Sequence, residues 1–151
     1  MFHRGLFATP DRCGPGPGRE EPPMTDHSRR LFRWSGLHGV RSDVLESPEA
    51  PADWHGLISV SRTPEESSVI GPWTGDGLGP YRAWSVPGPL APDLVGVLAG
   101  FLEPLRAAGI SVLAVSTHDT DWLLVEEGRA DAAEAAWIAT GVEVVDGIVA
   151  P

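Results

Sequence analysis

One polar loop carries the densest group of side chains with chemical potential. It runs from Ser116 through Thr117, His118 and Asp119 to Asp121. One imidazole and two carboxylates are ligand types that divalent metal ions accept, and the same groups suit polar contacts to a small molecule. In the alternative interpretation, the loop is a solvated turn whose Asp and Thr side chains bond their own backbone. A metal ion usually needs ligands from elsewhere too, and no second histidine-rich or acid-rich motif stands out, so the metal site is the less favoured hypothesis.

The second candidate site is the predicted start of a helix at residues 90–95, which include Leu90, Leu94 and Val95. A helix N-terminus presents unpaired backbone N–H groups and the positive end of a dipole, and it binds carboxylates and phosphates readily. Asp93 offers a competing use of those donors, because a carboxylate at this position could cap its own helix. The sequence leaves both readings open.

Other polar features indicate less. Thr63, Glu66, Ser67 and Ser68 surround a predicted hairpin turn and are typical of a solvated loop. The single cysteine, Cys13, excludes an intrachain disulfide and a cysteine metal cluster. The sequence contains no Gly-x-Ser-x-Gly motif, P-loop or dinucleotide fingerprint. It therefore predicts no cofactor.

Apolar periodicity predicts the elements that position these loops. Strands are expected at 31–37, 57–62, 67–70, 81–86, 110–116, 122–125 and 142–145, helices at 92–108 and 128–140, and a helical turn at 47–54. The nearly continuous apolar run at 110–116 predicts a central strand covered by helices. From residue 81 the order is β-α-β-β-α-β. This order predicts an α+β, ferredoxin-like open sandwich with two helices on one face of a mainly antiparallel sheet.

Composition limits the partners. The chain has 151 residues, 42% apolar content and a net charge of −10. A core is therefore possible, in one domain or two very small ones. An acidic protein repels phosphate backbones and anionic membrane surfaces, so neither nucleic acid nor a membrane is an expected partner. The lone cysteine suits a reducing cytoplasm.

Glycine and proline mark the expected boundaries. Residues 1–29 are predicted to be a disordered tail, because the Gly-Pro run at 14–18 supports neither helix nor strand. Met24 offers an alternative translation start. A Gly/Pro-rich segment at 72–80 predicts a linker between a reduced unit at 30–71 and a second unit at 81–147.

Three motifs in order, at 58–70, 88–111 and 116–125, make the chain resemble small bacterial proteins with tandem ACT-like domains. These are related to the regulatory domains of aspartate kinases and to the CASTOR arginine sensors. The resemblance implies two tandem ACT-like units, the first one reduced. It also implies a cytoplasmic, non-catalytic sensor that binds a small amino acid or similar metabolite between such units, with a homodimer formed by edge-to-edge pairing.

The resemblance also assigns roles to residues. Asp121 would contact the positively charged part of the ligand, and the rest of the loop at 116–121 would supply polar contacts. The turn at 90–95, with Ser68 and Val69 on a strand edge, would complete the pocket. Two alternatives remain: a metal-dependent enzyme built on His118, Asp119 and Asp121, and an ACT-like dimerisation module without a ligand.

Overall fold

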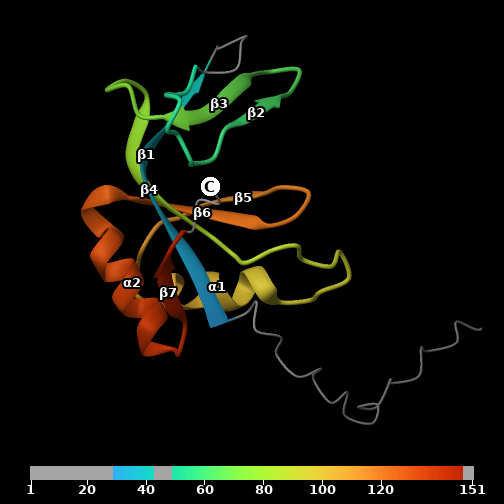
Figure 1. Cartoon of the computed structure of the whole chain (residues 1–151), viewed down its shortest axis with the longest axis vertical. Helices are drawn as coiled ribbons and strands as arrows, with labels where there is room; N and C mark the ends of the chain where they lie inside the picture. Colours follow the sequence, from blue (N-terminus) through green and yellow to red (C-terminus); the bar gives the residue numbers. More distant parts are fainter. Residues whose placement is uncertain (1–28, 43–48, 148–151) are drawn as a thin grey trace, which may run out of the picture.

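A computed structural model describes residues 29–42 and 49–147 of the chain (Figure 1). All of the predicted disordered tail except its last residue lies outside the described part. The described residues form seven strands and two α-helices. The strands join in one sheet, and the helices pack against it. This arrangement fits the predicted α+β, ferredoxin-like class.

The elements follow one another along the chain with these bounds. They are β1 (Arg30–Ser42), β2 (Ser59–Arg62), β3 (Ser67–Pro72), β4 (Leu78–Ser85), α1 (Val97–Ala107), β5 (Leu113–Ser116), β6 (Asp121–Glu126), the 3-10 turn η2 (Glu127–Arg129), α2 (Ala130–Ala139) and β7 (Glu143–Asp146). The predicted hairpin of β2 and β3 is confirmed, and its turn is closed by the Thr63 N–H, which donates to the Glu66 carbonyl at 2.8 Å.

The sheet is built around the long strand β1. The strand order is β2-β3-β1-β4-β6-β5, and β7 also pairs with β1, in parallel. Strand β1 therefore lies between β7 and β4, and its far end pairs with β3. Two separate tandem units are not confirmed, because β1 of the first predicted unit pairs with β4 and β7 of the second as well as with β3. The segment at 72–80 holds the end of β3 and the start of β4, and the domain boundaries at 30–71 and 81–147 stay a prediction.

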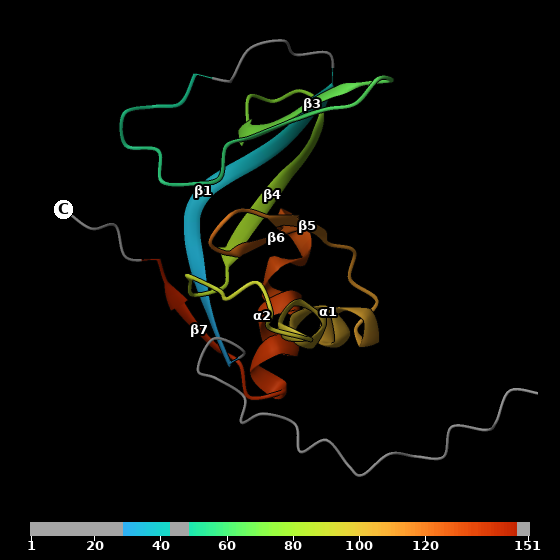
Figure 2. The same cartoon turned by 90° about the vertical axis from the view of Figure 1, so that its right-hand side faces the viewer.

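Both helices cover the same face of the sheet (Figure 2). Phe101 and Leu105 of α1 are fully buried against Trp84 of β4 and Trp137 of α2. The Trp84 and Trp137 rings meet edge to face at 5.1 Å, and the Trp137 indole N–H donates to the Phe101 carbonyl at 2.8 Å. Burial of each such side chain stabilises the fold by roughly 1.5–3 kcal/mol, so this layer fixes α1 firmly on the sheet.

The other face of the sheet carries a smaller cluster around a buried histidine. The His38 side chain is 0% exposed and lies against the Trp54 ring at a centroid distance of 4.8 Å. Its Nε2 accepts a hydrogen bond from the Leu57 N–H at 2.9 Å, and its Nδ1 lies 3.1 Å from the Gly36 carbonyl. These two bonds assign the proton to Nδ1 of a neutral ring. Burial lowers the pKa of His38 to about 4.

The predicted helix at 92–108 is wrong at its start. Helix α1 begins at Val97, and its N-cap Gly96 has a φ of 82°, a left-handed conformation that interrupts the helix and suits glycine. The residues before it form a turn in which the Leu94 N–H donates to the Ala91 carbonyl at 3.1 Å. Asp93 therefore lies outside the helix and does not cap it.

Two further predicted elements need correction. The apolar segment at 110–116 is not a central strand: β5 covers only its last four residues and lies at the edge of the sheet. The apolar start of this segment connects α1 to β5 instead. There the buried Ile110 donates its N–H to the Leu105 carbonyl at 2.9 Å, and this bond ends the helix. The described part of the predicted helical turn at 47–54 is a simple turn, with the Trp54 N–H on the Pro51 carbonyl at 2.9 Å.

Candidate functional site

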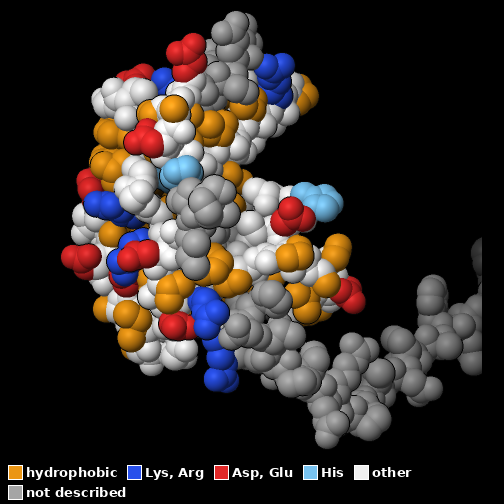
Figure 3. Space-filling model, viewed as in Figure 1, with side chains coloured by type: hydrophobic (Ala, Val, Ile, Leu, Met, Phe, Trp, Pro, Cys, Tyr) orange, Lys and Arg blue, Asp and Glu red, His pale blue; other side chains and the backbone are white. Residues whose placement is uncertain are grey.

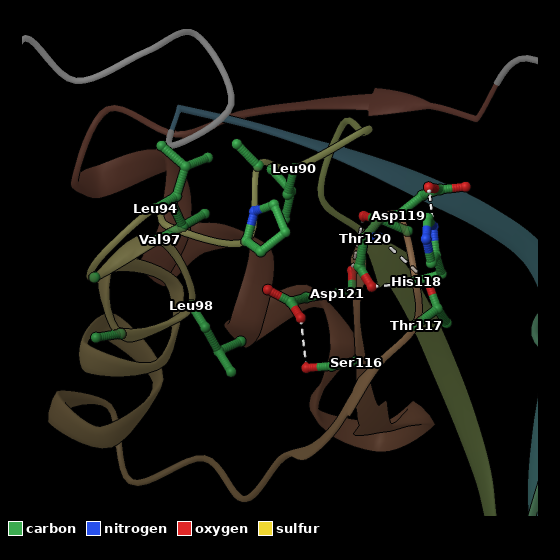
Figure 4. Close-up of a pocket in the computed structure, with 14 residues that line it drawn as sticks. Leu90, Leu94, Val97, Leu98, Ser116, Thr117, His118, Asp119, Thr120 and Asp121 are labelled. Atoms are coloured by element: carbon green, nitrogen blue, oxygen red, sulfur yellow. Dashed lines mark hydrogen bonds and ion pairs between the residues drawn. The ribbon is translucent and has the colours of Figure 1, made fainter.

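A pocket of about 470 Å³ lies between the β5–β6 hairpin and the start of α1 (Figure 4). Two stretches of chain form its walls: the segment that leads into the first turn of the helix, and the loop joining the two strands. Its lining residues are Leu90, Ala91, Pro92, Leu94, Gly96, Val97, Leu98, Ala99, Ser116, Thr117, His118, Asp119, Thr120 and Asp121. Figure 3 shows hydrophobic side chains gathered just below the tip of this hairpin.

The hairpin wall is a tight hydrogen-bonded turn. The Thr117 N–H donates to the Thr120 carbonyl at 2.8 Å, and the Thr117 hydroxyl donates to the same oxygen at 2.9 Å. In return, Thr117 Oγ1 accepts the Thr120 N–H at 3.2 Å. The structure thus confirms a hairpin turn in this loop, closed by bonds between Thr117 and Thr120.

Backbone bonds tie the two walls together. The Leu90 N–H donates to the Asp119 carbonyl at 2.8 Å, and the Val86 N–H donates to the Asp121 carbonyl at 2.9 Å. The Thr120 hydroxyl also donates to the Val86 carbonyl. Gly88 permits this close approach, because a Cβ there would lie 2.6 Å from the Asp119 carbonyl oxygen. Both walls therefore belong to one rigid arrangement.

Opposite charges face each other across the pocket. The half-buried Asp121 carboxylate accepts the Ser116 hydroxyl at 2.6 Å and is directed into the hollow (Figure 4). Across from it is the first turn of α1, which carries the positive end of the helix dipole and N–H groups without partners inside the helix. No acidic residue occupies that turn, and the N-cap Gly96 has no side chain to engage its donors.

The helix side of the pocket is apolar. Leu94 is 38% exposed, while Leu90, Val97 and Leu98 are half-buried and pack from behind against the main core. Figure 4 shows Leu94, Val97 and Leu98 on the opposite side of the pocket from the hairpin. The pocket therefore combines a polar wall, an apolar wall and one inward-facing carboxylate.

His118 and Asp119 lie at the rim. The His118 Nδ1 is 2.7 Å from the Asp119 carboxylate, and the two side chains are 97% and 68% exposed. The Asp121 carboxylate is hydrogen-bonded to Ser116 instead and does not join His118 and Asp119 in one cluster. Within 29–42 and 49–147, no three His, Cys, Asp or Glu side chains are grouped as a metal ion would require. The geometry thus gives no support to the metal-dependent alternative.

The structure brings together most of the predicted site residues, though not all. Seven of them line the pocket: Leu90, Leu94, Ser116, Thr117, His118, Asp119 and Asp121. Asp93 and Val95 adjoin it without lining it, and Val95 is 95% exposed. Ser68 and Val69 lie on β3, outside the lining. The Ser68 hydroxyl donates to Glu66 at 3.2 Å and Val69 is 1% exposed.

Sequence reasoning missed the first turn of α1, formed by Val97, Leu98 and Ala99. The helix was expected to start five residues earlier, at residue 92, so its first turn was misplaced. Gly96 was the available signal, because glycine at a helix boundary often marks a left-handed or capping position. Thr120 was missed within the predicted loop itself.

Comparison with known proteins agrees with the fold. An ACT domain is found at residues 80–136, which include every residue that lines the pocket. ACT domains are generally ligand-binding regulatory modules and are typically regulatory rather than catalytic. No protein of curated function matches the chain in sequence. Among the described residues, no helix is long and apolar enough to cross a lipid bilayer.

The solved structures that share the fold of the chain include two bacterial proteins. Protein Atu0741 from Agobacterium tumefaciens is 25% identical, with a TM-score of 0.66 over 82% of this chain and 96% of that one. VC0802 from Vibrio cholerae, a protein of unknown function described as a possible transport protein, is 15% identical. Its TM-score is 0.55 over 74% of this chain and 91% of that one. The second likeness concerns the fold alone.

Proposed function

We propose that this chain is a non-catalytic sensing module that binds a small amino acid in the pocket between α1 and the β5–β6 hairpin. One observation carries the proposal: the Asp121 carboxylate and the first turn of α1 lie on opposite sides of a single hollow. An α-amino acid has the matching pair of charges. Its ammonium group suits Asp121, and its carboxylate suits the backbone donors of the helix.

The size and polarity of the pocket support a small ligand. Sites for small molecules usually have volumes of roughly 300–1,000 Å³ and combine apolar walls with a few placed polar groups. The pocket here, at about 470 Å³, has one such carboxylate already oriented by Ser116. A hydrogen bond to a charged group contributes roughly 1.5–3 kcal/mol, so this contact alone is significant for a ligand of that size.

A homodimer in the cytoplasm belongs to the same proposal. Strand β5 lies at the edge of the sheet and Leu113 on it is 36% exposed. An edge strand presents backbone groups that can pair with a second copy. Sedimentation at several protein concentrations tests this point: a single species with the mass of one chain at all of them would contradict it.

Thermal melting across the amino acids and the common divalent cations tests the proposed function. A ligand that binds only the folded chain raises Tm by an amount set by its concentration relative to Kd. We expect at least one amino acid to raise Tm and Mg²⁺, Mn²⁺, Zn²⁺ and Ca²⁺ to leave it unchanged. A shift with a metal ion alone would favour the metal-dependent alternative, and no shift at all would favour a dimerisation module without a ligand.

A further inference from the structure

We propose that the amino acid bound in this pocket has an uncharged aliphatic side chain, which lies along the apolar wall formed by Leu90, Leu94, Val97 and Leu98. This inference rests on the proposed function, since it specifies the ligand of the same site. The carrying observation is the division of the pocket, with its inward carboxylate and its hydrocarbon surface on different walls (Figure 4).

The apolar wall exposes hydrocarbon surface that a ligand can cover. Leu94 is 38% exposed and is not part of the main core cluster, whereas Val97 and Leu98 pack behind it on that cluster. A ligand methylene placed on this wall is removed from water together with the leucine surface it covers, and both removals favour binding. Val97 and Leu98 of the wall belong to a helix that Phe101 and Leu105 fix on the sheet, so this part of the wall is already in place before a ligand binds.

The pocket has few polar groups left to pair with a charged side chain on the ligand. If the α-ammonium group uses Asp121 and the α-carboxylate uses the first turn of α1, the remaining lining acid is Asp119. Its carboxylate is engaged by His118 at the outer tip of the hairpin and is 68% exposed. The lining residues, all of them described, include no arginine. A terminal ammonium or carboxylate on the ligand would therefore meet hydrocarbon and lose hydration without a partner.

A series of amino acids whose side chains differ by one methylene at each step tests the role of the apolar wall directly. Burial of one methylene changes affinity by about fourfold. L-alanine, L-2-aminobutyrate, L-norvaline and L-norleucine should thus bind with Kd values that fall by a few-fold at each step until the wall is covered. L-lysine extends the norleucine chain by a terminal ammonium group, and it should bind at least tenfold more weakly than norleucine.

Calorimetric titration of the full chain with these five amino acids gives three distinct results. A falling Kd along the series, with lysine weaker than norleucine, supports the inference. A flat series, or lysine at least as tight as norleucine, overturns it while leaving the proposed function intact. Binding of none of the five, together with no hit in the melting screen, contradicts the proposed function itself.

Leu94→Ala tests the wall, because Leu94 contributes to the pocket surface without belonging to the buried core. This variant should flatten the dependence on chain length, so that norleucine loses about tenfold in affinity while alanine changes little. Leu78→Ala is the matched control: Leu78 is 62% exposed, lies at the start of β4 and is outside the pocket lining. Unchanged norleucine binding by Leu94→Ala would place the ligand's side chain elsewhere.

Discussion

The N–H of Leu90 donates a hydrogen bond of 2.8 Å to the carbonyl of Asp119, and this bond joins the helix-side wall of the pocket to the hairpin wall. The same carbonyl oxygen lies 2.6 Å from the position that a Cβ on Gly88 would take. The geometry of the pocket therefore depends on a backbone contact that tolerates no side chain, at a residue outside the lining.

Gly88→Ala should weaken ligand binding although Gly88 lies outside the pocket lining. The added methyl group meets backbone rather than a flexible side chain, so the two walls must move apart and the Leu90 to Asp119 bond lengthens or breaks. We expect a loss of about 1–3 kcal/mol in stability, measured by urea unfolding, and a clear loss of affinity.

Gly100→Ala is the control for that substitution. Gly100 lies inside α1, and a Cβ there meets nothing within 4 Å. Alanine has the higher helix propensity, so this variant should gain about 0.5–1 kcal/mol in stability and bind as the wild type does. Equal behaviour of the two alanine variants would show that the close approach at Gly88 does not matter.

Leu105→Ala should destabilise the protein more than Leu98→Ala. Both leucines are on α1, but Leu105 is 0% exposed in the core whereas Leu98 is half-buried and faces the pocket. We expect Leu105→Ala to cost about 2–5 kcal/mol and Leu98→Ala clearly less. Urea midpoints in the reverse order would mean that the helix presents a different face to the sheet.

Stability should fall as the pH is lowered from 6.5 to 4, because the folded chain keeps the buried His38 neutral. Its pKa is lowered to about 4, mainly by burial, so between these pH values the unfolded chain binds a proton that the folded chain does not. The contribution is fully present above pH 6.5 and is lost progressively toward pH 4, by about 3 kcal/mol in total.

His38→Asn removes this titration and should reduce the pH dependence of the urea midpoint over that range. His55→Asn, which replaces an exposed imidazole, should keep the wild-type dependence. Identical pH profiles for wild type and His38→Asn would show that His38 is already charged, or is accessible to water, in the folded state.

The local pattern of the sequence predicted much of the fold. Alternating polar and apolar residues located the β2–β3 hairpin, and the apolar periodicity located both helices, because these signals depend on neighbours in the chain. The start of α1 was misplaced because the decisive feature, the left-handed backbone of Gly96, is a single-residue property that periodicity does not register. The edge position of β5 depends on which strands pair, and pairing is a long-range property.

The full length and the position of strand β1 likewise could not be predicted from local sequence. Its apolar start was recognised, but its extension to Ser42 and its place between β7 and β4 follow from contacts with strands far along the chain. For the pocket, residue types alone singled out the loop at 116–121, which forms one of its walls. The approach of the first turn of α1 required the three-dimensional packing of the helix, and so the sequence could not place it.

Titration calorimetry of Asp121→Asn, with the amino acid that raises Tm most in the melting screen, tests the central claim most directly. The amide keeps the size of the carboxylate and can still accept the Ser116 hydroxyl, so the unliganded variant should melt as the wild type does. Loss of the charge opposite the ligand's ammonium group should weaken binding about ten- to a hundredfold. Asp93→Asn, which removes the same charge from an exposed acid outside the lining, should bind as tightly as wild type. If Asp121→Asn binds with wild-type affinity, the amino acid does not bind where this account places it.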